Sequence, residues 1–384
     1  MSHGDSLTAA ELACLRAIGP QLIFTFWSKK YADIPPFVRQ LREQIPDAAL
    51  VGCSTSGDIT AEGANTDSFL LTALRFEHTA LRVIEENDIA PGGEETVGAR
   101  LAAAIAQEGR ALDAPVAAVL CLAPGIHFNG STFIRGMTRN LPDNVRIAGG
   151  LSGDHGASVQ VFTLGPSGMG ERKAVAVALY GKALRMYIHG RGGWRAFGPT
   201  RKVTACQGNL LMKLDGKPAL ELYKRYLGPY AAELPTSALF FPFEVIDNEQ
   251  ASTGVYRTVL GVDEQAQTLS LAGSIELNSY IRLMQAGPDE LVTSAEQAGA
   301  DCMDERSQER VDGQALALLV SCIGRKLMMG DRTDEEILAV GDQLGENVML
   351  AGFYANGEFV PDGKEKRMAL NNQTMAVTLL TEIG

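Results

Sequence analysis

The chain has 384 residues with 46 acidic and 34 basic side chains, a formal net charge of −12 and a mean hydropathy of +0.00. This length predicts about two or three core-forming lobes, and the excess of negative charge argues against partners such as nucleic acid or an anionic membrane surface. The apolar runs fall well short of the roughly 18 residues that cross a bilayer, and residues 1–20 lack the apolar core of a signal peptide, so we expect a cytoplasmic protein.

The first strand–helix–strand unit lies near the amino terminus. We expect an apolar strand over residues 21–27, an amphipathic helix over 36–45 and a second strand over 48–52. Pro36 suits the opening turn of that helix, where a missing amide hydrogen costs nothing. The second strand runs into the glycine-rich turn VGCSTSGD, which ends in Asp58.

A second unit with the same order follows. Strands are expected over residues 116–122 and 145–149, with a helix over 131–141 between them. The turn AGGLSGD, which ends in Asp154, repeats the first turn with one residue fewer. We therefore expect an internal duplication; the alternative is a chance similarity between ordinary α/β connections.

The third unit lies near the carboxyl terminus. Its strands are expected over residues 316–322 and 348–352, and its turn, AGFYANGE, ends in Glu358. The intervening helix is expected to open with a capping box from Thr333 to Glu336 and to end at Gly345. One further apolar strand follows each of the three turns. These later strands are expected over residues 69–76, 174–180 and 375–380.

The region between the second and third units has a different pattern. It predicts a hairpin over residues 203–214 that closes through Asp215-Gly216, a helix over 218–227 and a strand over 238–245. The lobe boundary is expected near residues 190–198. The fold class that results is α/β with mixed α+β layers: two lobes, residues 1–190 and 191–384, with mixed sheets built from repeated strand–helix–strand units plus a later strand.

No catalytic set is recognisable. A Walker motif needs Lys and Ser or Thr after its second glycine, but Asp58 and Glu358 stand there, and no dinucleotide fingerprint follows a strand. The turns also miss the last glycine of a serine-hydrolase elbow. Cys53 and Cys322 would need a positioned base to act as nucleophiles, and the six cysteines lack zinc-site spacing. We therefore expect a protein that is not an enzyme.

The glycine-rich turns could instead line a ligand site. They place backbone amides, hydroxyls and one carboxylate each at the carboxyl ends of strands, where open α/β sheets bind ligands. The candidate ligand-binding residues are Asp58, Asp154, Glu358, Ser54 and Ser152. The alternative is that each carboxylate caps its own turn.

A histidine in the middle of the chain suggests a second kind of site. His189 ends an apolar strand and precedes a glycine-rich stretch with Arg191, Trp194 and Arg195. A strand-end histidine beside arginines is typical of an axial haem ligand whose guanidinium neighbours pair with the propionates. His127 and His155 are alternative metal ligands. An ordinary hydrogen-bonded histidine is the other interpretation.

Both halves of the sequence resemble the FIST family of signal-transduction sensor domains. The amino-terminal half carries the turns that end in Asp58 and Asp154. The carboxyl half carries segments typical of FIST C-terminal domains. These segments are residues 193–199, 203–204, 214–219, 321–325 and 350–354.

This resemblance implies a sensory module that signals to a separate partner such as a histidine kinase. The length and the stretch from His189 to Trp194 are similar to a stand-alone bacterial branch that is proposed to bind haem b and sense nitric oxide. The broader family is suggested to bind amino acids or related metabolites. A homo-oligomer is compatible with the sequence.

Overall fold

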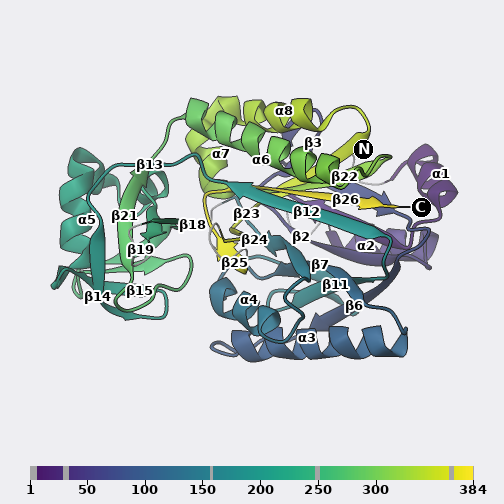
Figure 1. Cartoon of the computed structure of the whole chain (residues 1–384), viewed down its shortest axis with the longest axis horizontal. Helices are drawn as coiled ribbons and strands as arrows, with labels where there is room; N and C mark the ends of the chain where they lie inside the picture. Colours follow the sequence, from purple (N-terminus) through teal and green to yellow (C-terminus); the bar gives the residue numbers. More distant parts are fainter. Residues whose placement is uncertain (1–6, 29–33, 156–158, 247–250, 363–366, 384) are drawn as a thin grey trace.

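The structure, a computed structural model, describes residues 7–28, 34–155, 159–246, 251–362 and 367–383. Figure 1 shows a larger body with a smaller lobe beside it, and the lobe holds the strands between residues 195 and 285. The sheets of the body combine parallel and antiparallel strands, so the predicted α/β fold with mixed sheets and two lobes is confirmed. The lobes differ from the expected residues 1–190 and 191–384, because the third unit pairs with strands of the first two units and so belongs to the body. Within the described residues, every helix is too short or too polar to cross a bilayer.

Each predicted unit forms a parallel pair of strands joined by helix. The first comprises β1 (Leu22–Trp27), α2 (Ile34–Gln44) and β2 (Ala49–Ser54). The second comprises β7 (Val116–Ala123), α4 (Gly130–Thr138) and β8 (Arg146–Leu151). The third comprises β22 (Ala315–Cys322), α7 (Ile323–Met329), α8 (Thr333–Leu344) and β23 (Val348–Ala355). The later strands, antiparallel to the first strand of each unit, are β5 (Phe69–Leu74), β11 (Ala174–Tyr180) and β26 (Met375–Glu382).

One glycine has the same place in the register of all three parallel pairs. Gly52, Gly149 and Gly352 lie opposite a residue of the first strand of their own unit. A Cβ atom at these positions would lie 1.8 to 2.0 Å from that residue's carbonyl oxygen. Glycine is therefore required at this register, and the shared requirement identifies the units as structural repeats.

The units are interlocked by an exchange of hairpins. After its second strand, each unit sends a short hairpin to the sheet of another unit. Hairpin β3–β4 (Asp58–Thr60, Gly63–Asn65) pairs with β23, β9–β10 (Thr163–Gly165, Gly168–Gly170) pairs with β2, and β24–β25 (Gly357–Pro361, Met368–Asn371) pairs with β8. The exchange is cyclic, so the turns of all three units meet.

Backbone hydrogen bonds between the turns follow the same cycle. Ser56 N–H donates to Tyr354 O at 2.8 Å, Gly153 N–H donates to Ser54 O at 2.9 Å, and Asn356 N–H donates to Leu151 O at 3.2 Å. The three turns form a closed ring with approximate threefold symmetry.

The three sheets enclose a common apolar core. In β1, Leu22, Phe24 and Phe26 face this core, whereas Ile23 and Trp27 face the other way and pack under α2. The same alternation in β22 places Leu318 inside and Leu319 beneath α8, as expected when successive strand residues point to opposite faces.

The remaining elements complete the body and the lobe. The body adds α1 (Ala9–Ile18), β6 (Ala80–Glu86), α3 (Glu94–Ala111), β12 (Leu184–Arg191) and α6 (Pro288–Gln308). The strands of the lobe are β13 (Arg195–Ala196), β14 (Arg201–Gln207), β15 (Leu210–Leu214), β16 (Lys217–Pro218), β17 (Phe243–Ile246), β18 (Ser252–Arg257), β19 (Val259–Asp263), β20 (Thr268–Leu271) and β21 (Tyr280–Gln285). The remaining helices are α5 (Ala219–Leu227) and the 3₁₀ helices η2 (Gly228–Glu233), η3 (Thr236–Phe240) and η4 (Gly330–Arg332).

Two local predictions in the lobe were wrong. The hairpin of β14 and β15 turns at Gly208, because Gln207 already pairs with Leu210, and Asp215-Gly216 only links β15 to β16. The strand expected over residues 238–245 begins at Phe243, because Pro242 has no amide hydrogen and the preceding residues form η3.

The predicted capping box of α8 was also wrong. Thr333 is the first residue of the helix, not its N-cap, and its hydroxyl donates to Gly330 O. Glu336 instead binds the buried guanidinium of Arg325 on α7 at 2.7 Å, and both side chains are inaccessible to solvent. Glu336, which the local sequence pattern assigned to the helix cap, therefore forms a tertiary ion pair instead.

Candidate functional site

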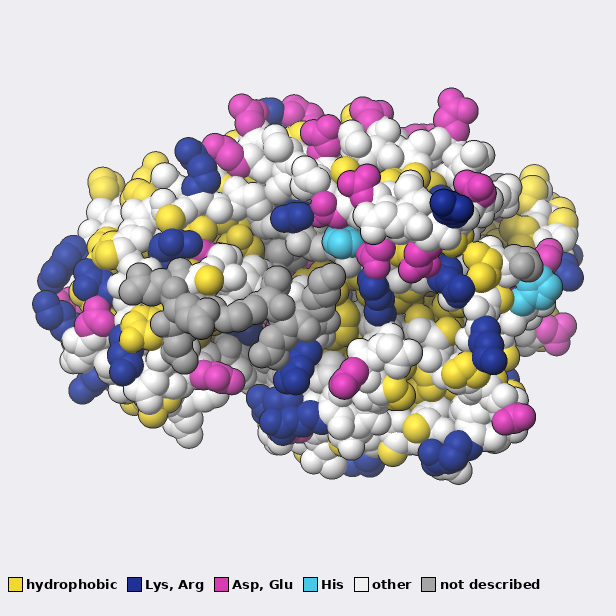
Figure 2. All heavy atoms as spheres, in the orientation of Figure 1, with side chains coloured by type: hydrophobic (Ala, Val, Ile, Leu, Met, Phe, Trp, Pro, Cys, Tyr) yellow, Lys and Arg dark blue, Asp and Glu magenta, His cyan; other side chains and the backbone are white. Residues whose placement is uncertain are grey.

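A cavity of about 770 Å³ lies where the second unit meets β12 and α6. The end of α4 and the start of β8 form one wall, and β12 and α6 form the opposite wall. Pro361, Asp362, Arg367 and Met368 also line the cavity. Figure 2 shows acidic and basic side chains side by side over β12 and α6 on this face of the body. We call this cavity the His189 pocket.

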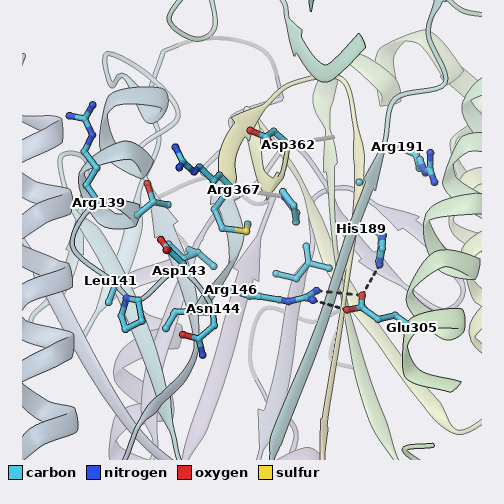
Figure 3. A pocket seen from close by; sticks show the side chains of 18 residues that line it. Arg139, Leu141, Asp143, Asn144, Arg146, His189, Arg191, Glu305, Asp362 and Arg367 are labelled. Carbon is cyan, nitrogen blue, oxygen red and sulfur yellow. Dashed lines mark hydrogen bonds and ion pairs between the residues drawn. The ribbon is translucent and has the colours of Figure 1, made fainter. Parts of the chain in front are cut away.

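Basic side chains from separate elements line the His189 pocket. Arg139 caps the end of α4, Arg146 begins β8, Arg191 ends β12, and Arg367 precedes β25 (Figure 3). Acidic side chains of Asp143, Glu305 and Asp362 also line it. The lining therefore offers both charges around one volume.

His189 belongs to a three-residue contact in which Glu305 is the central residue. Its Nε2 atom lies 2.8 Å from Glu305 Oε2, and Arg146 donates to Glu305 Oε1 at 2.6 Å (Figure 3). Burial alone would raise the pKa of Glu305, but hydrogen bonds from Arg146 and His189 lower it below the usual value. Glu305 is therefore ionised at neutral pH, and His189 Nε2 carries the hydrogen that it donates.

The other haem-site candidates lie in different places. Arg191 lines the pocket and pairs with Asp301 at 2.6 Å. Trp194 is buried in a separate apolar cluster, where its indole donates to Gln373 O at 2.8 Å. Arg195 is exposed and pairs with Glu290. The fold thus brings together His189 and Arg191, but not Trp194 and Arg195.

The alternative histidines, His127 and His155, lie in loops outside the pocket. His127 and His155 both have left-handed backbone conformations, with φ of 52° and 60°. His155 Nε2 lies 2.8 Å from the carbonyl oxygen of Ser28. Neither histidine is among the described residues that line the His189 pocket.

Two of the predicted turn carboxylates are buried at equivalent positions of their units. Asp58 accepts hydrogen bonds from Thr55, Ser28 and Ser68, and burial raises its pKa to about 6. Glu358 accepts two hydrogen bonds from Thr374, at 3.2 and 2.7 Å, and burial raises its pKa to about 8. Neither carboxylate lies on an open rim.

The third carboxylate, Asp154, is not equivalent to these two. Thr163 pairs with Cys53 as Asp58 pairs with Phe353, because the second unit has more residues between its second strand and its hairpin than the first unit has. Asp154 accepts a hydrogen bond from the backbone amide of Val159 at 2.7 Å.

Ser54 and Ser152 also bind within the turns. The Ser54 hydroxyl accepts from Phe162 N–H at 2.9 Å, and the Ser152 hydroxyl accepts from Gly125 N–H at 3.1 Å. These bonds hold the ring of turns in shape.

The pocket also contains residues that sequence reasoning missed, namely Arg139, Arg146, Glu305 and Arg367. Glu305 is 159 residues from Arg146 and 116 residues from His189. Their meeting follows from the packing of β8, β12 and α6, for which the local sequence carries no signal.

Family models match most of the chain. A FIST N domain matches residues 21–217, and a FIST C domain matches residues 219–361. The chain belongs to the FIST family. FIST domains are sensor domains that detect small ligands in signal transduction.

The other comparisons add little. No curated protein matches this FIST protein. Among solved structures it is similar to the cyanuic acid hydrolase from A. caulinodans, over 80% of this chain and 100% of that chain, with 14% identity and a TM-score of 0.20. A likeness this low carries no argument about fold or function.

Proposed function

We propose that this FIST protein is a non-enzymatic small-ligand sensor whose ligand occupies the His189 pocket. The observation that carries the proposal is the convergence of Arg146, Arg191 and an imidazole on one cavity of about 770 Å³. This volume is within the range of small-molecule and cofactor sites. The pocket also joins the second unit to the carboxyl half, so an occupant would contact both.

The ligand that we propose first is haem b, as expected for nitric oxide sensing. His189 would hold the iron, the guanidinium groups of Arg146 and Arg191 would pair with the propionates, and apolar side chains such as Ile188 and Met368 would face the macrocycle. Bound haem would supply the iron to which nitric oxide binds. Because Nε2 already contacts Glu305 at 2.8 Å, ligation through that atom requires His189 to leave the carboxylate.

The contact between His189 and Glu305 would transmit ligand binding to α6. Release of His189 would leave Glu305 with Arg146 alone, and Glu305 belongs to α6, which packs on α8 and β12. A change in α6 would be detected by a separate signalling protein, for which a histidine kinase is the partner we propose.

A haem titration of the full chain tests this function. The wild type should develop a Soret band that shifts when nitric oxide is added, and His189→Ala should change both the band and the shift. His127→Ala is the matched control, because this histidine lies outside the pocket. Identical spectra in wild type and His189→Ala would refute ligation by His189.

A haem-free sensor of an amino acid or related metabolite is the second candidate. The observation that favours it is the presence of both charges, since Asp143 and Arg146 line the same cavity, and a zwitterion needs both. A thermal-shift screen with amino acids tests it, because a ligand at about 100 times its Kd adds about 2.7 kcal/mol to the stability. Arg146→Ala should abolish a positive result.

A further inference from the structure

A second cavity, of about 570 Å³, lies between the lobe and α7 of the body. Its walls come from the connection after β13, from α5, η2 and η3, and from the end of β21, while Met328 of α7 faces them from the body. Figure 1 places α7 on the side of the body nearest the lobe. The cavity is separate from the His189 pocket and shares none of its lining residues.

Five of the eleven residues that line this cavity are aromatic, namely Phe197, Tyr226, Tyr230, Phe240 and Phe241. Phe197 and Tyr230 each pack against Phe241, with ring centroids 5.8 and 5.4 Å away, and they are 41% and 53% exposed. A single exposed ring is ordinary, but grouped rings around a concave volume are typical of a ligand site.

The charges next to the cavity are neutralised within the protein. Arg201 binds the Tyr226 hydroxyl and pairs with Asp215 at 2.9 Å. Arg195, which precedes Phe197 by two residues, pairs with Glu290 at 2.9 Å. The cavity therefore has no net charge to offer a ligand, and Gln285 supplies a polar side chain for one or two hydrogen bonds.

We propose that this aromatic cleft is a second binding site, which takes a neutral, mainly apolar small molecule with a planar ring system. Planar rings gain from offset or edge-to-face contact with aromatic side chains. An extended peptide is a poorer occupant, because its backbone amides and carbonyls would need more polar partners than the cleft provides.

The position of the cleft gives its occupant a structural role. Beside Phe240, Leu239 O accepts from the Gln373 side chain at 3.0 Å, and Gln373 O in turn accepts from Trp194 at 2.8 Å. These bonds attach the lobe to the body next to the cleft. A molecule between Phe241 and Met328 would therefore contact both parts and stabilise their arrangement.

Fluorescence titration of the full chain with N-phenyl-1-naphthylamine, a neutral aromatic probe, tests the proposal. The wild type should bind the probe with saturation, and Tyr230→Ala and Phe197→Ala should each weaken binding about tenfold. Leu260→Ala is the matched control, because Leu260 is 57% exposed on β19 and does not line the cleft. Circular dichroism confirms that each variant is folded.

The outcomes are distinct. Weaker binding in the two cleft variants with unchanged binding in Leu260→Ala supports the site. Absence of saturable binding, or equal binding in all variants, overturns it, as does a concentration-dependent dimer that Tyr230→Ala abolishes, since the cleft would then hold a second copy of the chain. Binding of the probe should not depend on haem, because His189 does not line the cleft and His189→Ala should bind the probe as the wild type does.

Discussion

The buried carboxyl group of Glu358 lowers the stability of this protein at neutral pH. Burial raises its pKa from 4.5 to about 8, so the folded state binds the proton more tightly than the unfolded state between these two values. Stability therefore falls as the pH rises through this window, by about 1.4 kcal/mol per pH unit. The accumulated cost is about 3 kcal/mol at pH 7 and about 5 kcal/mol above pH 8.

Glu358→Gln should remove this cost. The glutamine oxygen can accept the two hydrogen bonds from Thr374 that Oε2 accepts now, and the amide does not titrate. Oε1 has no hydrogen-bond partner among the described residues, with only the weakly donating Cys322 thiol nearby, so an NH₂ group there displaces no strong contact. The variant should be more stable by up to about 3 kcal/mol at pH 7, and equal to wild type near pH 4.5.

Urea unfolding between pH 4.5 and pH 8.5, followed by circular dichroism, measures the effect. The informative quantity is the difference in unfolding free energy between variant and wild type, which should grow with pH. Glu221→Gln is the control, because that side chain is exposed on α5. A variant that is less stable at pH 7, or a difference that stays constant with pH, would show that Glu358 is not protonated in the folded protein.

Two further substitutions test the packing around this site. Arg325→Leu should lower the free energy of unfolding by about 3–5 kcal/mol, because it leaves Glu336 charged and buried without its partner. The control, Arg332→Leu on the surface, should lower it by less than about 1 kcal/mol. Equal losses of the two variants in urea unfolding would contradict this. Gly352→Ala should lower the free energy of unfolding by about 4 kcal/mol or more, because its Cβ would lie 1.9 Å from a carbonyl oxygen of the adjacent strand. The control is Gly261→Ala, whose Cβ would have its nearest neighbour at 3.8 Å. This variant should change the thermal midpoint of unfolding little.

Much of the body could be predicted from the sequence, because apolar periodicity reports which strands and helices form. The unit strands were placed to within a few residues, and the glycine of each turn marked the repeat. The hairpin exchange could not be predicted. Its strands, such as Asp58–Thr60, are three to five residues long and pair with another unit, so neither their length nor their pattern indicates the partner.

The same limit applies to the candidate site. His189 was chosen as a candidate because it ends an apolar strand beside glycines and arginines. Arg146 looks like any polar residue at the start of a strand, and Glu305 like any acidic residue of a helix, so only the packing of three distant elements brings them together. The turn sequence that ends in Asp154 resembles the other two, but Thr163 takes the equivalent place in the register.

The two equivalent carboxylates, Asp58 and Glu358, have different surroundings although the threefold pattern relates their positions. Asp58 is surrounded by three hydroxyl donors, which lower its pKa and partly offset the effect of burial. Glu358 has donors on one oxygen, and the residue that follows Gln373 supplies them. Gln373 is the residue that attaches the lobe through Leu239. Burial raises the pKa of both acids, so both cost stability at neutral pH. Of these two acids, Glu358 is the one bound by the residue next to the lobe attachment, because Thr374 follows Gln373 in the chain.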